Sequence, residues 1–357
     1  MNCLICALLL GTAALIPARA QGARAGERES ITFILGEDED PAQPMFPVAE
    51  RYFREDPVER TDQVISNLRS LSEVRDFLAG HPSRNGRPWG LVNLVAHAND
   101  NGLLDVDLRP GGPKTTLETL SASIQNRTFK SLPDACLDGR SELRIQGCSV
   151  GKDVPLMKAL SSAFGGDDPQ RPLVRATPWF TCFQFNPAHQ RAVRVLCESW
   201  KQLYRPGERP TNRVLAMRFH SSLPKADFDI AEALSHPFPV TPEAAFSYES
   251  SARFQWTSIY PGGDVPSVVG ALRTRTWLLS QESLQRRLSA LGWRFHQLIW
   301  ETTPTIHQVG GTEYRALQTI GRARVIHLLK PIVAPKNSGA PPPELAWEDP
   351  RYYVTAR

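Results

Sequence analysis

The sequence predicts an α/β domain with a mostly parallel sheet flanked by helices on both faces, followed by a carboxy-terminal α+β region. Short apolar or β-branched runs of strand length alternate with stretches whose apolar residues recur at helical spacing. Two of these runs end in polar, glycine-containing turns, and open parallel sheets place their sites at such strand ends. The chain has 357 residues, of which 41% are hydrophobic, enough for two domains.

The amino-terminal half begins with a β-branched run at residues 31–35, which predicts the first strand of the sheet. Residues 63–68 predict a second, short strand. Ser70 and Glu73 have the spacing of a capping box, so we expect a helix to begin there and continue to about Ala79.

Two further strands carry the reactive side chains. Residues 91–96 form a buried run that stops at His97, and residues 143–145 lead to Cys148. A helix is expected after Cys148, because Asp153 can cap it and Pro155 falls in its first turn. Between the two strands, residues 103–108 predict a hairpin or edge strand, and an apolar stripe at residues 117–124 predicts a helix.

The rest of the chain has weaker patterns. Residues 171–177 predict another parallel strand, with a second run at residues 179–185. Residues 188–203 predict an amphipathic helix, residues 212–219 a strand, residues 228–234 a short helix and residues 280–300 a long helix. Residues 313–319 and 323–329 predict a hairpin that turns at residues 320–322, and residues 334–343 are rich in Pro and predict an exposed tail or linker.

The amino terminus predicts a secretory signal peptide. Residues 3–16 are apolar but too short to span a membrane, and Pro17-Ala18-Arg19-Ala20 supplies a cleavage site. We therefore expect a periplasmic or secreted protein without stable membrane insertion after signal removal. The alternative is an uncleaved membrane anchor. A formal net charge of +4, with no basic run interleaved with aromatic residues, gives no indication of nucleic-acid binding.

The spacing of His97 and Cys148 resembles that of a known enzyme family. Cys148 stands in Gln146-Gly147-Cys148-Ser149-Val150-Gly151, and His97 lies 51 residues before it. The caspase signature is Gln-Ala-Cys followed by Arg, Gln or Gly and then Gly, with a His about 50 residues upstream. The region from about residue 31 to residue 185 therefore resembles the caspase-like cysteine peptidases of clan CD, which include metacaspases, gingipains, legumain and separase.

This resemblance implies a catalytic dyad. Cys148 would attack the scissile carbonyl, and His97 would help to form the thiolate and protonate the leaving amine. It also implies an oxyanion hole made by the backbone N–H groups of Cys148 and Ala98, each worth about 3 kcal/mol of barrier. The family has Gly after the His, where this chain has Ala98, and caspases have Ala where this chain has Gly147. If that position requires positive φ, Ala98 is strained or the hole is displaced.

The substrate pocket is indicated by two conflicting features. Carboxylates in the tract of residues 37–40, among them Glu37 and Asp38, would favour Arg or Lys substrates, whereas Gln146 matches the caspases, whose pocket takes Asp. The alternative for the tract is a solvated or calcium-binding loop. Trp179 and Phe180 either line the substrate groove or are buried core aromatics.

We therefore predict a signal peptide at residues 1–20, a caspase-like catalytic domain at residues 31–205, a carboxy-terminal region of unknown role at residues 206–330 and a Pro-rich tail at residues 331–357. The predicted activity is a Cys–His endopeptidase acting on a peptide or protein without a cofactor. The alternatives are an inactive caspase-like surface, adhesion or binding module and a simple core cysteine. No zinc or P-loop motif is present. If Cys148 stays a free thiol, then Cys136, Cys182 and Cys197 remain and at most one disulfide can form, whose partners the sequence does not choose.

Overall fold

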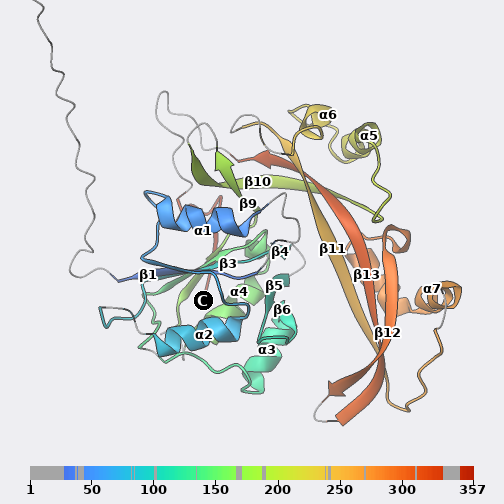
Figure 1. Cartoon of the computed structure of the whole chain (residues 1–357), viewed down its shortest axis with the longest axis horizontal. Helices are drawn as coiled ribbons and strands as arrows, with labels where there is room; N and C mark the ends of the chain where they lie inside the picture. Colours follow the sequence, from blue (N-terminus) through green and yellow to red (C-terminus); the bar gives the residue numbers. More distant parts are fainter. Residues whose placement is uncertain are drawn as a thin grey trace, which may run out of the picture.

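The computed structural model describes residues 28–357 with several gaps, so the predicted signal peptide and Glu37 lie outside the described residues. The gaps are residues 37, 39–43, 82, 84, 100–102, 134, 166–170, 187–189, 238, 240–242, 269–270, 310–311 and 333–345. Within the described residues, no helix is both long enough and apolar enough to cross a bilayer. The chain forms an α/β body and a separate antiparallel half-barrel sheet (Figure 1).

The α/β body is built on a six-stranded sheet, as the alternating pattern predicts. Its strands lie in the order β14-β8-β7-β3-β1-β2. The first five in the chain run parallel, and β14 pairs antiparallel with β8 at the edge. Their bounds are β1 (Ser30–Ile34), β2 (Gln63–Ile65), β3 (Leu91–Val95), β7 (Glu142–Gln146), β8 (Leu173–Ala176) and β14 (Val354–Ala356).

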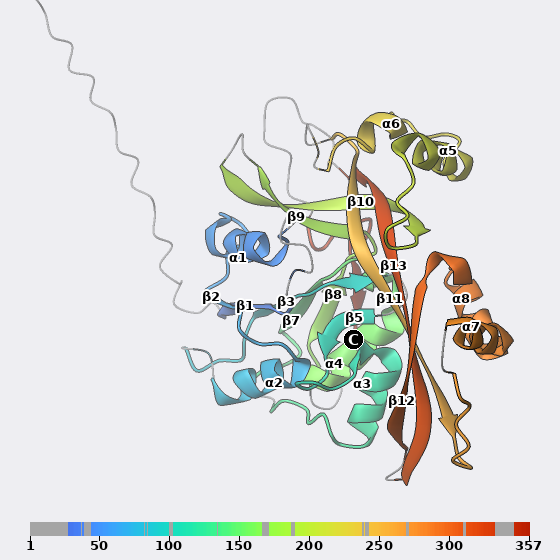
Figure 2. The ribbon, with the colours of Figure 1, turned by 45° about the vertical axis from the view of Figure 1, so that its right-hand side comes forward.

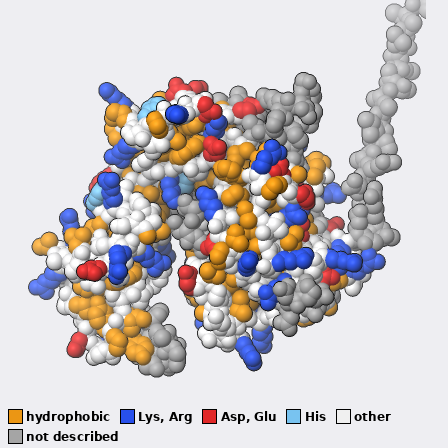
Figure 3. Space-filling model, turned by 180° about the vertical axis from the view of Figure 1, so that it is seen from behind, with side chains coloured by type: hydrophobic (Ala, Val, Ile, Leu, Met, Phe, Trp, Pro, Cys, Tyr) orange, Lys and Arg blue, Asp and Glu red, His pale blue; other side chains and the backbone are white. Residues whose placement is uncertain are grey.

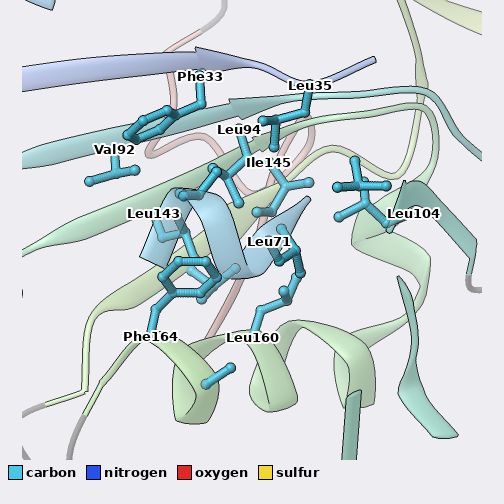
Figure 4. Close-up of a cluster of buried hydrophobic side chains, with 14 of the residues drawn as sticks. Phe33, Leu35, Leu71, Val92, Leu94, Leu104, Leu143, Ile145, Leu160 and Phe164 are labelled. Carbon is cyan, nitrogen blue, oxygen red and sulfur yellow. The ribbon is translucent and has the colours of Figure 1, made fainter. Parts of the chain in front are cut away.

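Helices cover both faces of this sheet (Figure 1). Three of them, α2 (Leu71–Gly80), α3 (Leu117–Gln125) and α4 (Val154–Phe164), contribute to the main core on one face. In Figure 4 the side chains of Phe33, Leu94 and Ile145 from the sheet point toward Leu71, Leu160 and Phe164 from the helices. On the other face, α1 (Phe46–Glu55) packs on Ile34, Val64 and Val95 and also reaches the second sheet.

Local capping positions two of these helices as the sequence predicts. The Ser70 side chain accepts a hydrogen bond from the Glu73 N–H at the start of α2. Asp153 accepts one from the Leu156 N–H at the start of α4, where Pro155 occupies the first turn. A small sheet of β4 (Ala98–Asn99), β5 (Leu103–Asp107) and β6 (Lys114–Thr116) follows His97, as expected for the predicted hairpin.

The second sheet is antiparallel, with strand order β11-β13-β10-β9 and β12 paired to β13 (Figure 2). Its bounds are β9 (Phe180–Asn186), β10 (Arg191–Tyr204), β11 (Phe246–Tyr260), β12 (Ile299–Val309) and β13 (Thr312–Pro331). Two helix pairs pack against it, α5 (Asn212–Ser222) with α6 (Ile230–Ala233) and α7 (Ala271–Ser280) with α8 (Glu282–Ala290). Seen from behind, a hollow separates the half-barrel from the α/β body (Figure 3).

Four predicted elements of this region are wrong. The helix predicted at residues 188–203 is β10, which pairs with β9 on one side and β13 on the other. The strand predicted at residues 212–219 is α5, capped by Thr211. The helix predicted at residues 280–300 stops after α8, and β12 follows it. The predicted hairpin is one continuous strand, β13, because Gly321 makes room for a packed side chain: a Cβ there would lie 2.6 Å from Leu298 Cδ2.

The carboxy terminus also differs from the predicted tail. Residues 346–357 pack on the α/β body, with Trp347, Tyr353 and Ala356 all buried. The Trp347 indole N–H donates to Glu59 Oε1 at 2.9 Å, and the guanidinium carbons of Arg144 and Arg194 lie 4.5 and 4.6 Å from its ring centre. The second sheet begins before the domain boundary predicted at residue 205, because it includes β9 and β10.

Candidate active site

His97 and Cys148 lie level with each other at the carboxyl edge of adjacent strands. In the ladder between β3 and β7, Val95 pairs with Gln146, and each reactive residue comes two positions later. Val95 packs on the face that α1 covers, and the ring of His97, two residues later, contacts Phe46 of α1. Parallel pairing of β3 with β7 therefore brings two segments that lie 51 residues apart in the sequence to the same edge of the sheet.

Cys148 is a thiol held in a tightly anchored loop. Its side chain is 7% exposed, it takes part in no disulfide, and its Sγ donates to the carbonyl oxygen of Thr181 at 3.5 Å. Ser149, which follows it, has φ +60°, a left-handed conformation that costs a non-glycine residue about 1 kcal/mol. The Ser149 N–H donates to the Trp179 carbonyl at 2.8 Å, which helps to hold this conformation.

Two glycines allow the Cys148 loop to approach its neighbours closely. A Cβ on Gly147 would lie 2.9 Å from Ala98 Cβ and 3.2 Å from Ala96 O, on the two sides of His97. A Cβ on Gly151 would lie 2.7 Å from the backbone carbonyl carbon of Thr177. The residues flanking His97 and the residue before Cys148 are thus in van der Waals contact.

His97 contacts a carboxylate that the sequence had associated with substrate. Its ring is one-third exposed, its Nε2 lies 3.9 Å from Asp38 Oδ1, and its ring centre lies 4.8 Å from that of Phe46 in an edge-on arrangement. At that distance Asp38 and His97 form no hydrogen bond and attract each other when the imidazole is protonated.

Asp38 also holds the start of α1. Its Oδ1 accepts from the Met45 N–H at 2.9 Å and its Oδ2 from the Phe46 N–H at 3.2 Å. Asp38 follows β1, and His97 follows β3. The chain continues from β1 to β2 on one side and then returns to β3 on the other side, so the switch point of the sheet lies between β1 and β3. Ligands of open α/β sheets bind outside the carboxyl ends of strands at such a point.

Ala98 has ordinary backbone geometry. It lies in β4 and is not among the described residues with positive φ, so the strain considered for this position is absent. The Asp105 N–H donates to the His97 carbonyl at 2.8 Å, which makes Ala98 and Leu104 a non-hydrogen-bonded pair of the β4–β5 ladder. The Ala98 N–H therefore points away from β5.

The comparisons with known proteins come out negative. No family model matches the chain, and neither the curated proteins nor the solved structures contain a significant match. The function must therefore be argued from the geometry of the site.

Two of the residues predicted for substrate binding, Gln146 and Trp179, make hydrogen bonds within the protein. Gln146 is 2% exposed, and its amide links Asn93 on β3 to Arg194 on β10, whose Nη1 donates to Gln146 Oε1 at 3.0 Å. Trp179 is half-buried, and its indole N–H donates to the Arg351 carbonyl at 3.0 Å. Glu37 lies outside the described residues.

A pocket of about 300 Å³ lies beside the Cys148 loop. It combines aromatic walls with Lys152 and Glu198, and neither His97 nor Cys148 borders it. Its lining residues are Ser149, Lys152, Pro178, Trp179, Phe180, Cys197, Glu198, Ser199 and Trp200. In the part of the chain that the structure describes, no three His, Cys, Asp or Glu side chains are arranged to hold a metal ion.

Several features of the site were missed in the sequence. These are α1, the contact of Asp38 and Phe46 with His97, and the Thr181 carbonyl beside Cys148. Pro47 in the first turn of α1 is a signal that would have revealed the helix. The contacts themselves join segments far apart in the chain, and no local pattern encodes them.

Proposed function

We propose that this chain is a cysteine endopeptidase in which Cys148 is the nucleophile and His97 the general acid. One observation carries the proposal: Val95 at the end of β3 pairs with Gln146 at the end of β7, so His97 and Cys148 each follow the carboxyl end of adjacent parallel strands by two residues. The residues flanking them are in contact through Gly147 and Ala98. The caspase-like spacing of the two residues supports the same assignment.

The reaction begins when the Cys148 proton moves to His97, which gives a thiolate and an imidazolium. At present the thiol donates to the Thr181 carbonyl, so this contact must break as the proton leaves. The Asp38 carboxylate, 3.9 Å from His97 Nε2, favours the charged imidazolium. Because Asp38 is itself held by two backbone N–H groups of α1, its position is fixed before substrate arrives.

Peptide cleavage then follows the usual two stages of covalent catalysis. The thiolate attacks the scissile carbonyl, and the resulting oxyanion is stabilised by the backbone N–H groups of Cys148 and Ala98. His97 donates its proton to the leaving amine, which leaves a thioester on Cys148. Water, deprotonated by His97, attacks the thioester and releases the carboxyl product.

The rival proposal is a non-catalytic binding module with the same fold. It is favoured by the low exposure of Cys148 and by the hydrogen bond that its thiol donates to Thr181. A surface or adhesion role would leave both residues in place without turnover. The peptidase proposal accounts better for Asp38, whose carboxylate faces His97 at the switch point of the sheet.

A thiol-directed peptide probe separates the two proposals. We expect the intact protein, in neutral reducing buffer, to be labelled on the tryptic peptide of residues 145–152, which contains Cys148 alone among the cysteines. The variant Cys148→Ala should lose the label, and His97→Ala should label far more slowly. Cys136→Ala is the matched control, because burial raises the pKa of that thiol and it lies in the main core.

An intact protein that takes up no label, although the unfolded protein does, contradicts the peptidase proposal. Equal labelling of the protein and its His97→Ala variant contradicts it as well, since the thiol would then react without the imidazole.

The substrate and the location of the protein are part of the proposal. The acidic tract at residues 37–40 favours cleavage after Arg or Lys. Asp38 itself binds the first N–H groups of α1 and faces His97, so the substrate would be bound by the other carboxylates of the tract. Fluorogenic Arg, Lys and Asp peptides test this preference, and faster cleavage after Asp contradicts it. Export after removal of residues 1–20 is tested by amino-terminal sequencing of the protein from the periplasm or the medium.

A further inference from the structure

Two of the four described cysteines lie next to each other on adjacent strands. In the ladder between β9 and β10, Cys182 pairs with Val195 and Cys197 pairs with Phe180. The two cysteines are therefore diagonal neighbours, two positions apart in register, and their side chains project from the same face of the sheet. Figure 2 shows β9 and β10 side by side above α1.

The packing around this pair is mostly apolar. Cys182 is 9% exposed and Cys197 is fully buried, and they form a small cluster with Phe246 and Leu329. A hydrogen bond with the Cys197 thiol and, after that, burial raise the pKa of Cys182 well above its ordinary value. Diagonal neighbours are farther apart than directly opposite ones, but the two side chains project from the same face and belong to the same buried cluster.

We infer that Cys182 and Cys197 form a disulfide under oxidising conditions. The two thiols lose two electrons and two protons, and a sulfur–sulfur bond forms between them. The electrons pass by thiol–disulfide exchange to an external disulfide, such as oxidised glutathione, which is reduced to two thiols. This inference goes beyond the proposed peptidase activity and does not depend on it.

The fold argues against the other pairings. Cys136 belongs to the main core, where α2 and α4 pack on the opposite face of the parallel sheet from α1. Cys148 is held at the strand edge by its contact with the Thr181 carbonyl, the residue just before Cys182. Joining Cys182 to Cys197 therefore leaves Cys148 as a thiol and fixes the strand that contacts it.

Peptide mapping tests the inference directly, because each of the four described cysteines falls on a different tryptic peptide. These peptides cover residues 131–140, 145–152, 176–191 and 195–201. The full chain is equilibrated with oxidised and reduced glutathione, unfolded, alkylated and digested. We expect peptides 176–191 and 195–201 to be joined, with alkylated Cys136 and Cys148 on the other two.

Thermal unfolding provides the second measurement. Closing a loop of about 15 residues should raise the Tm of the oxidised protein by roughly 5 °C over the reduced protein. The double variant Cys182→Ala with Cys197→Ala should lose this difference, and Cys136→Ala should keep it. Four alkylated cysteines after equilibration with excess oxidised glutathione, or a link that includes Cys136 or Cys148, would overturn the inference. Because the readout is a covalent link, a failure here is distinct from a failure of Cys148 labelling.

Discussion

The Cβ atom of Ala98 lies 2.9 Å from the position that a Cβ on Gly147 would take. The family that this region resembles has Gly after the His and, in caspases, Ala before the Cys, which is the reverse of Ala98 and Gly147. The space between the ends of β3 and β7 therefore holds one methyl group, and in this chain that group is the Cβ of Ala98, the residue after His97. Ala98 is thus matched sterically by Gly147.

The first prediction tests this exchange with a double-mutant cycle. Gly147→Ala should lower the free energy of unfolding by about 1–3 kcal/mol, because the added methyl overpacks the contact with Ala98. Ala98→Gly combined with Gly147→Ala should recover most of that loss and most of the Cys148 labelling rate. Urea unfolding measures the first quantity and the peptide probe the second. A double variant as unstable as the sum of the two single variants would contradict the exchange.

The second prediction concerns Asp38. Asp38→Asn keeps one side-chain oxygen for the start of α1 but removes the charge that faces His97. We expect Cys148 labelling to slow by about tenfold, equivalent to about 1.4 kcal/mol, while stability falls by less than about 1 kcal/mol. Thr211→Ala, which removes the cap of α5 in the second sheet, is the control and should leave labelling unchanged. If labelling falls only as far as the folded fraction does, Asp38 serves α1 alone.

The third prediction concerns the carboxy-terminal segment. Trp347→Ala should lower the free energy of unfolding by about 3–5 kcal/mol, since it empties a buried site and removes the partner of Glu59. Leu272→Ala, at a side chain that is 78% exposed, should change stability by less than about 0.5 kcal/mol. Equal effects of the two changes would mean that residues 346–357 do not pack on the body in solution.

The fourth prediction is a dependence of stability on acid. Arg28 donates two hydrogen bonds to Asp138, at 2.6 and 2.7 Å, and this contact lowers the pKa of Asp138 from 3.8 to about 2. Between pH 3.8 and about 2, Asp138 is protonated more readily in the unfolded chain than in the folded protein. The ion pair with Arg28 therefore stabilises the fold fully above pH 3.8, and this contribution is lost as the pH falls through about 2.

Asp138→Asn should therefore flatten the decrease in stability on acidification from pH 4 to 2, as measured by urea unfolding across that range. Arg28→Met should flatten it in the same way, because it removes the partner of the carboxylate. A decrease that is equally steep in both variants and in the unchanged protein would show that other groups cause it.

Local patterns were sufficient for the amino-terminal half of the fold. The caps at Ser70 and Asp153, and the apolar runs that became β1, β3 and β7, depend on residues within one turn or one strand. The same patterns identified His97 and Cys148 as strand-end residues, and the strands that they follow pair in parallel. These features were predictable because their causes lie close together in the chain.

Only the tertiary structure decided the second sheet and the surroundings of His97 and Cys148. Residues 188–203 have an amphipathic pattern that suits a helix, yet residues 191–204 form β10, which has a strand along each of its edges. Gly321 looked like a turn residue, yet it lies inside β13 because a side chain of Leu298 fills the space above it. Asp38 faces His97 because β1 and β3 pair side by side, and a relationship between segments some sixty residues apart has no periodicity for the sequence to display.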